Sequence, residues 1–318
     1  PLITYAELVY PVIFIHGLNS NNETWDPFKT YLENNHDLLN GGTMNFCLNS
    51  DGDLKIAGFE NDYIDFQAEN QNNLKKGDFY FINFDVDYYG LSPAISLVNV
   101  LGNQQAIYKQ GRAVRDAIKH VLKVSGKDKV VLIGHSMGGL AAREYLSNSN
   151  IWQTDGNHHV AKLFTTGTPH GGTNSTILGA GALLGLDETA DATRDLKYSY
   201  IFGGKGVYLF GGIESHDNIS NNLFFKYHSV DVNCNDSIGE NIVGLNEKSI
   251  PTDIYYSCAI GTNYVSGGDG LVSDYRANMN NYMSYSVPFS FKADTFLVND
   301  IHTKLTSLKE LNTKGMDE

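Results

Sequence analysis

A short glycine-bracketed segment, Gly134-His-Ser136-Met-Gly138, carries the side chain best suited to covalent chemistry. The pattern G-x-S-x-G places a serine on a sharp turn between a strand and a helix. The context fits, because the apolar run VVLI precedes the motif and the helix-forming run GLAAREYL follows it. A serine hydroxyl is a weak nucleophile until a nearby base takes its proton. Ser136 is therefore the candidate nucleophile, and a glycine-rich turn without chemistry is the alternative interpretation.

The base should come from one of ten histidines, and His302 fits best. In chains with the order Ser, Asp, His, the histidine comes last, and His302 lies four residues beyond Val298, at the end of the last predicted strand. For the other histidines we expect packing inside the motifs (His16, His135), a structural role in a turn (His170), or solvation in loops and on polar helix faces (His36, His120, His158, His159, His216, His228).

The same chain order requires an acid between Ser136 and His302. Asp269, in the loop SGGDGLV, fits that requirement best. Its carboxylate would accept the Nδ1 proton of the histidine, fix the tautomer and stabilise the imidazolium. Asp253, Asp274 and Asp300 remain alternative acids. A further alternative is that Asp269 only caps its own glycine-rich turn.

Two backbone N–H groups are candidates for stabilising a developing oxyanion. Met137 would stand at the start of the helix after the nucleophile, where N–H groups point toward the reacting carbon. The second donor should come from the loop that follows the first core strand, His16-Gly17-Leu18, and the candidate there is Leu18.

The elements that must position these residues alternate between strands and helices. Apolar, β-branched runs predict strands, and spacings of three, four and seven residues predict a helix over 104–124 that Gly126 ends. Two further helices are expected over 25–32 and 140–146. The strands are predicted at 8–15, 79–84, 130–133, 160–165, 254–260 and 295–298. This alternation favours a mostly parallel central sheet of about six strands with helices on both faces. Together with the G-x-S-x-G turn, it predicts an α/β-hydrolase fold.

One region interrupts the alternation. Residues 171–251 contain no clear strand of the sheet, although the stretches 177–186 and 200–212 are apolar and rich in glycine. Without internal repeats or a low-complexity linker, the chain reads as a single domain over 1–318 with a helical cap or lid insertion at 171–251. A mobile apolar cap over the active site and a buried helical subdomain are both open.

Composition excludes several classes of protein. The net charge of −13 and the pI near 5.1 disfavour nucleic-acid binding. No apolar run reaches the roughly 18 residues that a membrane-spanning helix needs, and the sequence shows no leader, although it begins with Pro1 rather than Met. The low lysine and arginine content predicts a secreted protein. Cys47, Cys234 and Cys258 allow one disulfide or three free thiols.

The motifs PVIFIHGL, GHSMGGL, GTPHGG, GDGLV and NDIHTKL together resemble those of the bacterial true lipases, the secreted triacylglycerol lipases of Pseudomonas and Burkholderia type. The resemblance runs from about Val12 to His302, with a dissimilar middle. It implies the same catalytic set, Ser136, Asp269 and His302, and the same oxyanion residues, Leu18 and Met137.

The resemblance also implies a structural calcium, and here the sequence departs from the family. Lys304 occupies the position, two residues after the catalytic histidine, where the family has a ligating aspartate. A cation cannot ligate calcium, so the family site is in doubt and no cofactor is expected to be required. The loops 49–53 and 231–236 offer oxygen ligands without the spacing of an EF-hand, so we expect solvated loops there, with a bound calcium or other ion as the alternative.

The predicted function is hydrolysis of carboxylic esters, with a triacylglycerol lipase that degrades lipid as the leading hypothesis. Its partners would be a lipid or small ester and a lipid–water interface. A phospholipase, a polyester hydrolase or a deacylase of the GPI-remodelling type would use the same side chains. The alternative from a different class is a non-catalytic binding protein on a hydrolase scaffold.

Overall fold

The structure is a computed structural model of the 318-residue chain. It describes residues 8–49, 63–69, 74–92, 102–173, 190–196, 245–263, 267–283 and 291–306. Within these residues no helix is both long and apolar enough to cross a bilayer.

A single eight-stranded sheet forms the centre of the molecule, in the order β3-β2-β4-β1-β5-β6-β7-β8. Every neighbouring pair is parallel except β2 and β3. The strands are β1 (Val12–Ile15), β2 (Asn40–Leu48), β3 (Tyr63–Asp65), β4 (Phe79–Asn83), β5 (Val130–His135), β6 (Val160–Thr166), β7 (Tyr255–Gly261) and β8 (Asp294–Val298). The predicted fold class is confirmed, and each of the six predicted strands is present.

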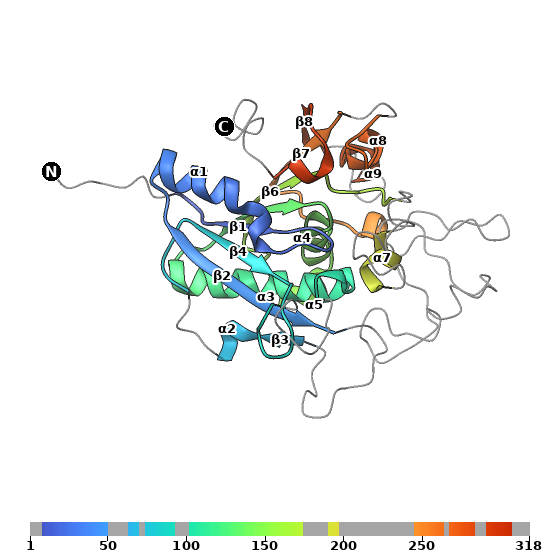
Figure 1. The fold of residues 1–318 in the computed structure, drawn as a ribbon. Helices are drawn as coiled ribbons and strands as arrows, with labels where there is room; N and C mark the ends of the chain where they lie inside the picture. The colour runs from blue at the N-terminus through green and yellow to red at the C-terminus, as the bar shows by residue number, and fades with distance from the viewer. Residues whose placement is uncertain are drawn as a thin grey trace.

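Helices cover both faces of this sheet (Figure 1). The longer ones are α1 (Asp26–His36), α3 (Ile107–Ser125) and α4 (Met137–Ser147). The shorter ones are α2 (Phe66–Glu69), α5 (Ser149–Trp152), α7 (Asp191–Leu196), α8 (Asp274–Ala277) and α9 (Asn280–Met283), with 3-10 turns η1 (Asn22–Trp25), η3 (Gly102–Gln104), η6 (Leu245–Glu247) and η7 (His302–Lys304). Gly126 ends α3 as predicted, with φ of +71° and its N–H bonded to Leu122 O.

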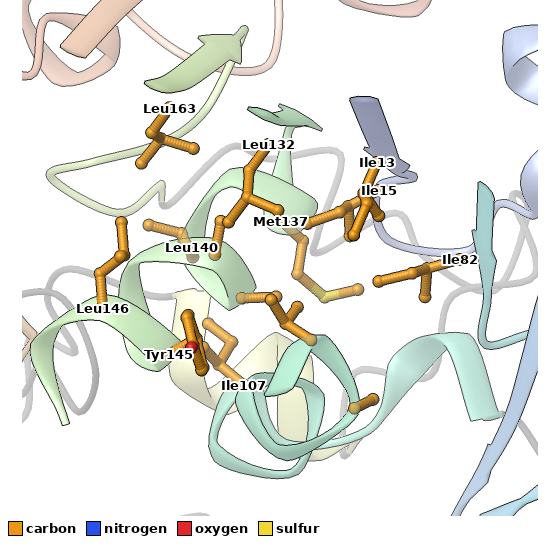
Figure 2. Packing of buried hydrophobic residues seen from close by; sticks show 14 of the residues in the cluster. Ile13, Ile15, Ile82, Ile107, Leu132, Met137, Leu140, Tyr145, Leu146 and Leu163 are labelled. Carbon is orange, nitrogen blue, oxygen red and sulfur yellow. The ribbon is translucent and has the colours of Figure 1, made fainter. Parts of the chain in front are cut away.

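The central strands are apolar throughout because both of their faces are buried. Ile13 and Ile15 belong to the core against α3 and α4, whereas Phe14 between them packs with Phe28 of α1 on the opposite face. Successive side chains of a strand point to opposite faces, which explains this division. Figure 2 shows Ile13, Ile15 and Leu132 directed from the strands toward Met137 of α4. The start of α4 is thereby fixed against the middle of the sheet.

Two strands were not predicted, so the expected number of about six is wrong. In β2, NGGTMNFCL, polar residues interrupt the apolar ones, and the strand has a register shift between Asn40 and Gly42. Its partner β3 has only three residues and forms the edge of the sheet. Neither segment has the uninterrupted apolar run that identified the buried parallel strands.

Most of the predicted cap lies outside the described residues, including both of its apolar stretches, 177–186 and 200–212. Within 171–251 the structure describes residues 171–173, α7 with residue 190 before it, and the segment from η6 to Pro251. Cys47 and Cys258 are buried free thiols, and Cys234 lies outside the described residues.

Candidate active site

The nucleophile elbow is built at the junction of β5 and α4. Ser136 has φ of 52° and ψ of −125°, a backbone conformation that is strained for a residue with a side chain. Its N–H donates to Thr166 O of β6 at 2.9 Å, which holds the turn against the sheet. A Cβ on Gly134 would lie 2.5 Å from Gly139 N. A Cβ on Gly138 would lie 2.5 Å from the backbone oxygens of Ile15 and His16, at the end of β1. The motif therefore requires glycine at both positions.

The structure brings Ser136, His302 and Asp269 together in one chain of hydrogen bonds. His302 Nε2 lies 2.9 Å from Ser136 Oγ, and His302 Nδ1 lies 2.7 Å from Asp269 Oδ2. Both distances fall in the range expected for a base in contact with its nucleophile and its orienting acid. The three residues are 8%, 7% and 2% exposed respectively, so the polar chain runs through a largely dry region. In such surroundings its hydrogen bonds are stronger than they would be in water.

Asp269 uses its two carboxylate oxygens for different partners. Oδ1 accepts hydrogen bonds from the N–H groups of Leu271 and Val272, at 3.0 and 2.8 Å. Oδ2 is thereby directed at His302, whose own N–H donates to Asp269 O at 3.0 Å. Asp269 therefore has both of the roles considered from the sequence, because it caps its own turn and contacts the histidine.

The three alternative acids are occupied elsewhere. Asp253 contacts His158 Nε2 at 3.1 Å. Asp274 is exposed in the first turn of α8, and its Oδ1 accepts the Tyr275 N–H. Asp300 accepts the N–H of the residue that follows it. None of these carboxylates bonds His302 in the structure.

The two predicted oxyanion donors lie beside the nucleophile. Met137 is the first residue of α4, where backbone N–H groups have no partner within the helix. Leu18 lines the pocket in front of Ser136. In the preceding peptide, Gly17 O accepts from His16 Nδ1 at 2.9 Å, because His16 Nε2 is already the acceptor for Phe84 N–H. The C=O and N–H of a trans peptide point in opposite directions, so this bond turns the Leu18 N–H away from the His16 ring.

Burial keeps two motif histidines neutral. Desolvation lowers the pKa of His16 to about 4, against the smaller opposing effect of its bond to the Gly17 carbonyl. Desolvation, with His302 nearby, lowers the pKa of His135 to about 3. A neutral His135 donates from Nε2 to the backbone carbonyl of His302 at 3.0 Å. This residue of the elbow therefore also holds the loop that carries the base, a role beyond the packing predicted for it.

His170 has the structural role that the sequence predicted. It is fully buried, and its ring lies 3.0 Å from Thr165 Oγ1 and 3.1 Å from a guanidinium nitrogen of Arg143. Burial, and secondarily Arg143, lowers the pKa of His170 well below its usual value. Arg143 also donates to Asn246 Oδ1 of η6 at 2.7 Å. Sequence reasoning missed Arg143, because an arginine on a predicted helix gives no sign of complete burial.

A cavity of about 230 Å³ opens in front of Ser136. The lining residues from the loop after β1 and from η1 are mainly polar, and those from the loops after β6 and β7 and from α7 are mainly apolar. The first set is Gly17, Leu18, Asn19, Ser20 and Thr24, and the second set is Pro169, Thr173, Leu196, Leu271 and Val272; His135 and Thr303 also line the cavity.

The described residues do not fit the calcium site that the lipase resemblance implies. They contain no group of three or more His, Cys, Asp or Glu side chains able to hold a metal ion. Lys304 belongs to the η7 turn that also contains His302, so a cationic residue occupies the position in this turn where the family has a ligand. The acidic positions Asp51, Asp53, Asp231 and Asp236 lie outside the described residues.

Comparison with known proteins gives a family and a fold. Residues 9–179, slightly more than half of the chain, match the family model of the PGAP1-like alpha/beta domain. The matched range includes Ser136 and both oxyanion candidates and ends before Asp269 and His302. The product of the gene lin2722 from Listeria innocua has a similar fold, with a TM-score of 0.51 and 16% identity over 97% of this chain and 96% of that one.

Two curated relatives share a shorter region. The GPI inositol-deacylases of Mus musculus and Rattus norvegicus are each 30% identical over 122 residues, which is 37% of this chain. The aligned region spans 13% of the length of those relatives. These comparisons confirm the predicted superfamily and do not extend to the narrower true-lipase type. The chain belongs to the PGAP1-like alpha/beta domain family, within the α/β-hydrolase superfamily.

Proposed function

We propose that the protein hydrolyses carboxylic esters with Ser136 as nucleophile, His302 as base and Asp269 as the acid that orients the base. One observation carries this proposal. A serine on a strained strand-to-helix turn lies 2.9 Å from a histidine, which lies 2.7 Å from a buried aspartate, and the serine and the histidine line a cavity. Each of the three side chains comes from the loop after a different parallel strand, at the end where open α/β sheets bind ligands.

In the proposed reaction His302 Nε2 takes the Ser136 hydroxyl proton as Oγ attacks the ester carbonyl. The N–H groups of Leu18 and Met137 stabilise the negative oxygen of the tetrahedral intermediate. The imidazolium of His302, stabilised by Asp269, returns its proton to the leaving alkoxide, and an acyl-enzyme remains. A water molecule activated by the same imidazole then releases the acid and restores the serine.

We propose that the substrate is a lipid acyl ester, and the first candidate for the activity is that of a triacylglycerol lipase. The apolar residues that line the cavity, which include Pro169, Leu196 and Leu271, support this proposal because they suit a hydrocarbon chain. A phospholipase or a polyester hydrolase would use the same surface. We also propose that the protein is secreted, for which the composition remains the support.

A deacylase of the GPI-remodelling type is the second candidate, and the 30% identity to two GPI inositol-deacylases favours it. The polar residues that line the cavity, with Asn19, Ser20 and Thr24 among them, would suit a hydroxyl-rich alcohol. The two candidates differ in the alcohol that leaves, and they share the acyl-enzyme step at Ser136.

Labelling with a fluorophosphonate probe tests the proposal against a non-catalytic binding protein. We expect one covalent adduct, located at Ser136 by peptide mass spectrometry and absent from Ser136→Ala. Competing emulsified triacylglycerol, phospholipid and palmitoylated inositol against a p-nitrophenyl ester then identifies the preferred alcohol. A wild-type protein that takes no label and hydrolyses no ester would overturn the proposed function.

We further propose that catalysis requires no metal ion, and Lys304, in the same turn as His302 at the family's ligand position, supports this proposal. Incubation with EDTA should leave ester turnover unchanged, and added calcium should not increase it. Loss of activity in EDTA that calcium restores would refute this proposal.

A further inference from the structure

Two residues of the predicted insertion, Thr173 and Leu196, form part of the cavity wall. Leu196 ends α7, is 2% exposed, and lines the cavity together with Pro169, Leu271 and Val272. Resting on the proposed ester hydrolysis, we propose that Leu196 sets the size of the acyl group that fits beside Ser136, and that Asp195 and Thr173 hold it in place. Leu196 could not be predicted as a site residue, because its segment has neither a motif nor a periodic pattern.

Thr173 links two parts of this wall. Its N–H donates to Leu196 O at 2.7 Å, and its hydroxyl donates to Leu271 O at 2.6 Å. Leu196 lies on α7 and Leu271 lies in the loop that contains Asp269, so the two reach the cavity from segments far apart in the sequence. Thr173 therefore connects Leu196 by hydrogen bonds to the loop that contains the acid, Asp269.

Asp195 anchors the other side of Leu196. Its Oδ2 accepts the N–H of Ile107 at 2.9 Å, and the side chain is 1% exposed. Ile107 is the first residue of α3, and the residue before it, Ala106, provides no side-chain cap. The Asp195 carboxylate therefore caps the N-terminus of α3, although it lies far from that helix in the sequence. The N-terminus of a helix favours negative charge.

These contacts tie the wall to the elements that hold the nucleophile. The helix α3 packs against α4, and α4 begins at Met137 immediately after Ser136. The hydrogen bonds of Thr173 and Asp195 thus connect Leu196 and its helix both to the loop of Asp269 and to the helix that packs on α4. A wall fixed in this way limits the length or width of the acyl group, because a longer chain cannot displace it without breaking those bonds.

The first test measures kcat/KM for p-nitrophenyl esters from acetate to laurate. Leu196→Ala removes most of the side chain and should raise the octanoate-to-butyrate ratio about tenfold. Leu196→Trp should lower the same ratio about tenfold, while acetate is still hydrolysed. Leu297→Ala, the same change at a 57% exposed position of β8, is the matched control and should keep the wild-type ratio.

Positioning by Asp195 is tested by a pair of substitutions. Asp195→Ala removes the cap and should flatten the dependence of kcat/KM on chain length, mainly through KM. Asp195→Asn keeps an oxygen at the same place and should restore most of the discrimination. A general loss of stability would instead lower kcat/KM equally for every ester.

Fluorophosphonate labelling of each variant separates this inference from the proposed function. Leu196 variants that label normally and keep the wild-type chain-length profile would overturn the role of Leu196 alone. Shifted profiles in opposite directions for Ala and Trp, with normal labelling, would support it. A wild-type chain that neither labels nor hydrolyses any ester would refute the proposed function itself.

Discussion

The two halves of the candidate site are held in different ways. Ser136 and the oxyanion loop follow β5 and β1, central strands whose residues are almost entirely buried on both faces. Asp269 and His302 follow β7 and β8, and β8 is one of the two edge strands, with exposed residues such as Leu297. Close packing fixes the nucleophile half, and the other half has less packing available to it.

Hydrogen bonds from the centre compensate for that difference. His135 Nε2 donates to the His302 carbonyl at 3.0 Å, and Thr166 Oγ1 donates to Leu305 O, also at 3.0 Å. Both donors stand at the ends of the buried strands β5 and β6. The comparison indicates that the nucleophile is positioned by its own strand, whereas the base is positioned by side chains of the other half.

Removing the nucleophile should have the largest effect. Ser136→Ala should lower kcat by on the order of 10⁴ or more, while the fold persists because a small side chain is trimmed. Initial rates on p-nitrophenyl butyrate and the thermal midpoint measure the two quantities. A variant that keeps a tenth of the activity would mean that the reaction uses another nucleophile.

Replacing the acid comes next. Asp269→Asn should lower kcat by about 10³ to 10⁴, because the amide can leave His302 in the wrong tautomer. Asp274→Asn, a matched change at an exposed position nearby in the sequence, should have little effect. Activity lost in Asp274→Asn and kept in Asp269→Asn would reverse the choice of acid.

Removing the hydrogen bond between β5 and the His302 loop should lower kcat by a smaller factor. His135→Ala removes one hydrogen bond to the His302 carbonyl, so we expect kcat to fall about tenfold, the equivalent of a single hydrogen bond. KM should change little, since the bond acts on the base. The control is His158→Ala, whose ring contacts Asp253 instead. If both variants keep full kcat, the base does not depend on the central half.

The smallest effect concerns stability in mild acid. His16 and His135, with pKa values lowered to about 4 and about 3, stay neutral when folded, whereas the unfolded chain takes up protons near pH 6.5. The unfolded state then binds more protons, so the free energy of unfolding should fall as pH drops from about 6.5 toward 4. Urea unfolding at several pH values measures this slope.

The control for the acid effect is His135→Gln, which has one titrating group fewer and should show a shallower slope. A slope identical to that of the unchanged protein would contradict the buried, neutral state of His135.

Much of this site could be predicted because its residues lie in short segments with strict local requirements. G-x-S-x-G needs glycines where a Cβ would collide with the backbone, and these glycines can be recognised directly in the sequence. His302 and Asp269 followed from chain order. The hydrogen bonds of His135, Arg143 and Asp195 could not be predicted, because each joins residues at least 88 positions apart or depends on burial. The same limit applies to β2 and β3, whose pairing is not visible in their own residues.

The position of His302 after the edge strand has a consequence for how the protein would lose activity. Edge strands open to solvent more easily than central ones, in partial unfolding events that leave the rest of the domain folded. Amide hydrogens of β8 should therefore exchange with deuterium faster than those of β5. On gradual heating, the base would leave Ser136 while the central strands remain protected. The temperature at which the enzyme stops working would then report the opening of one strand rather than the melting of the domain.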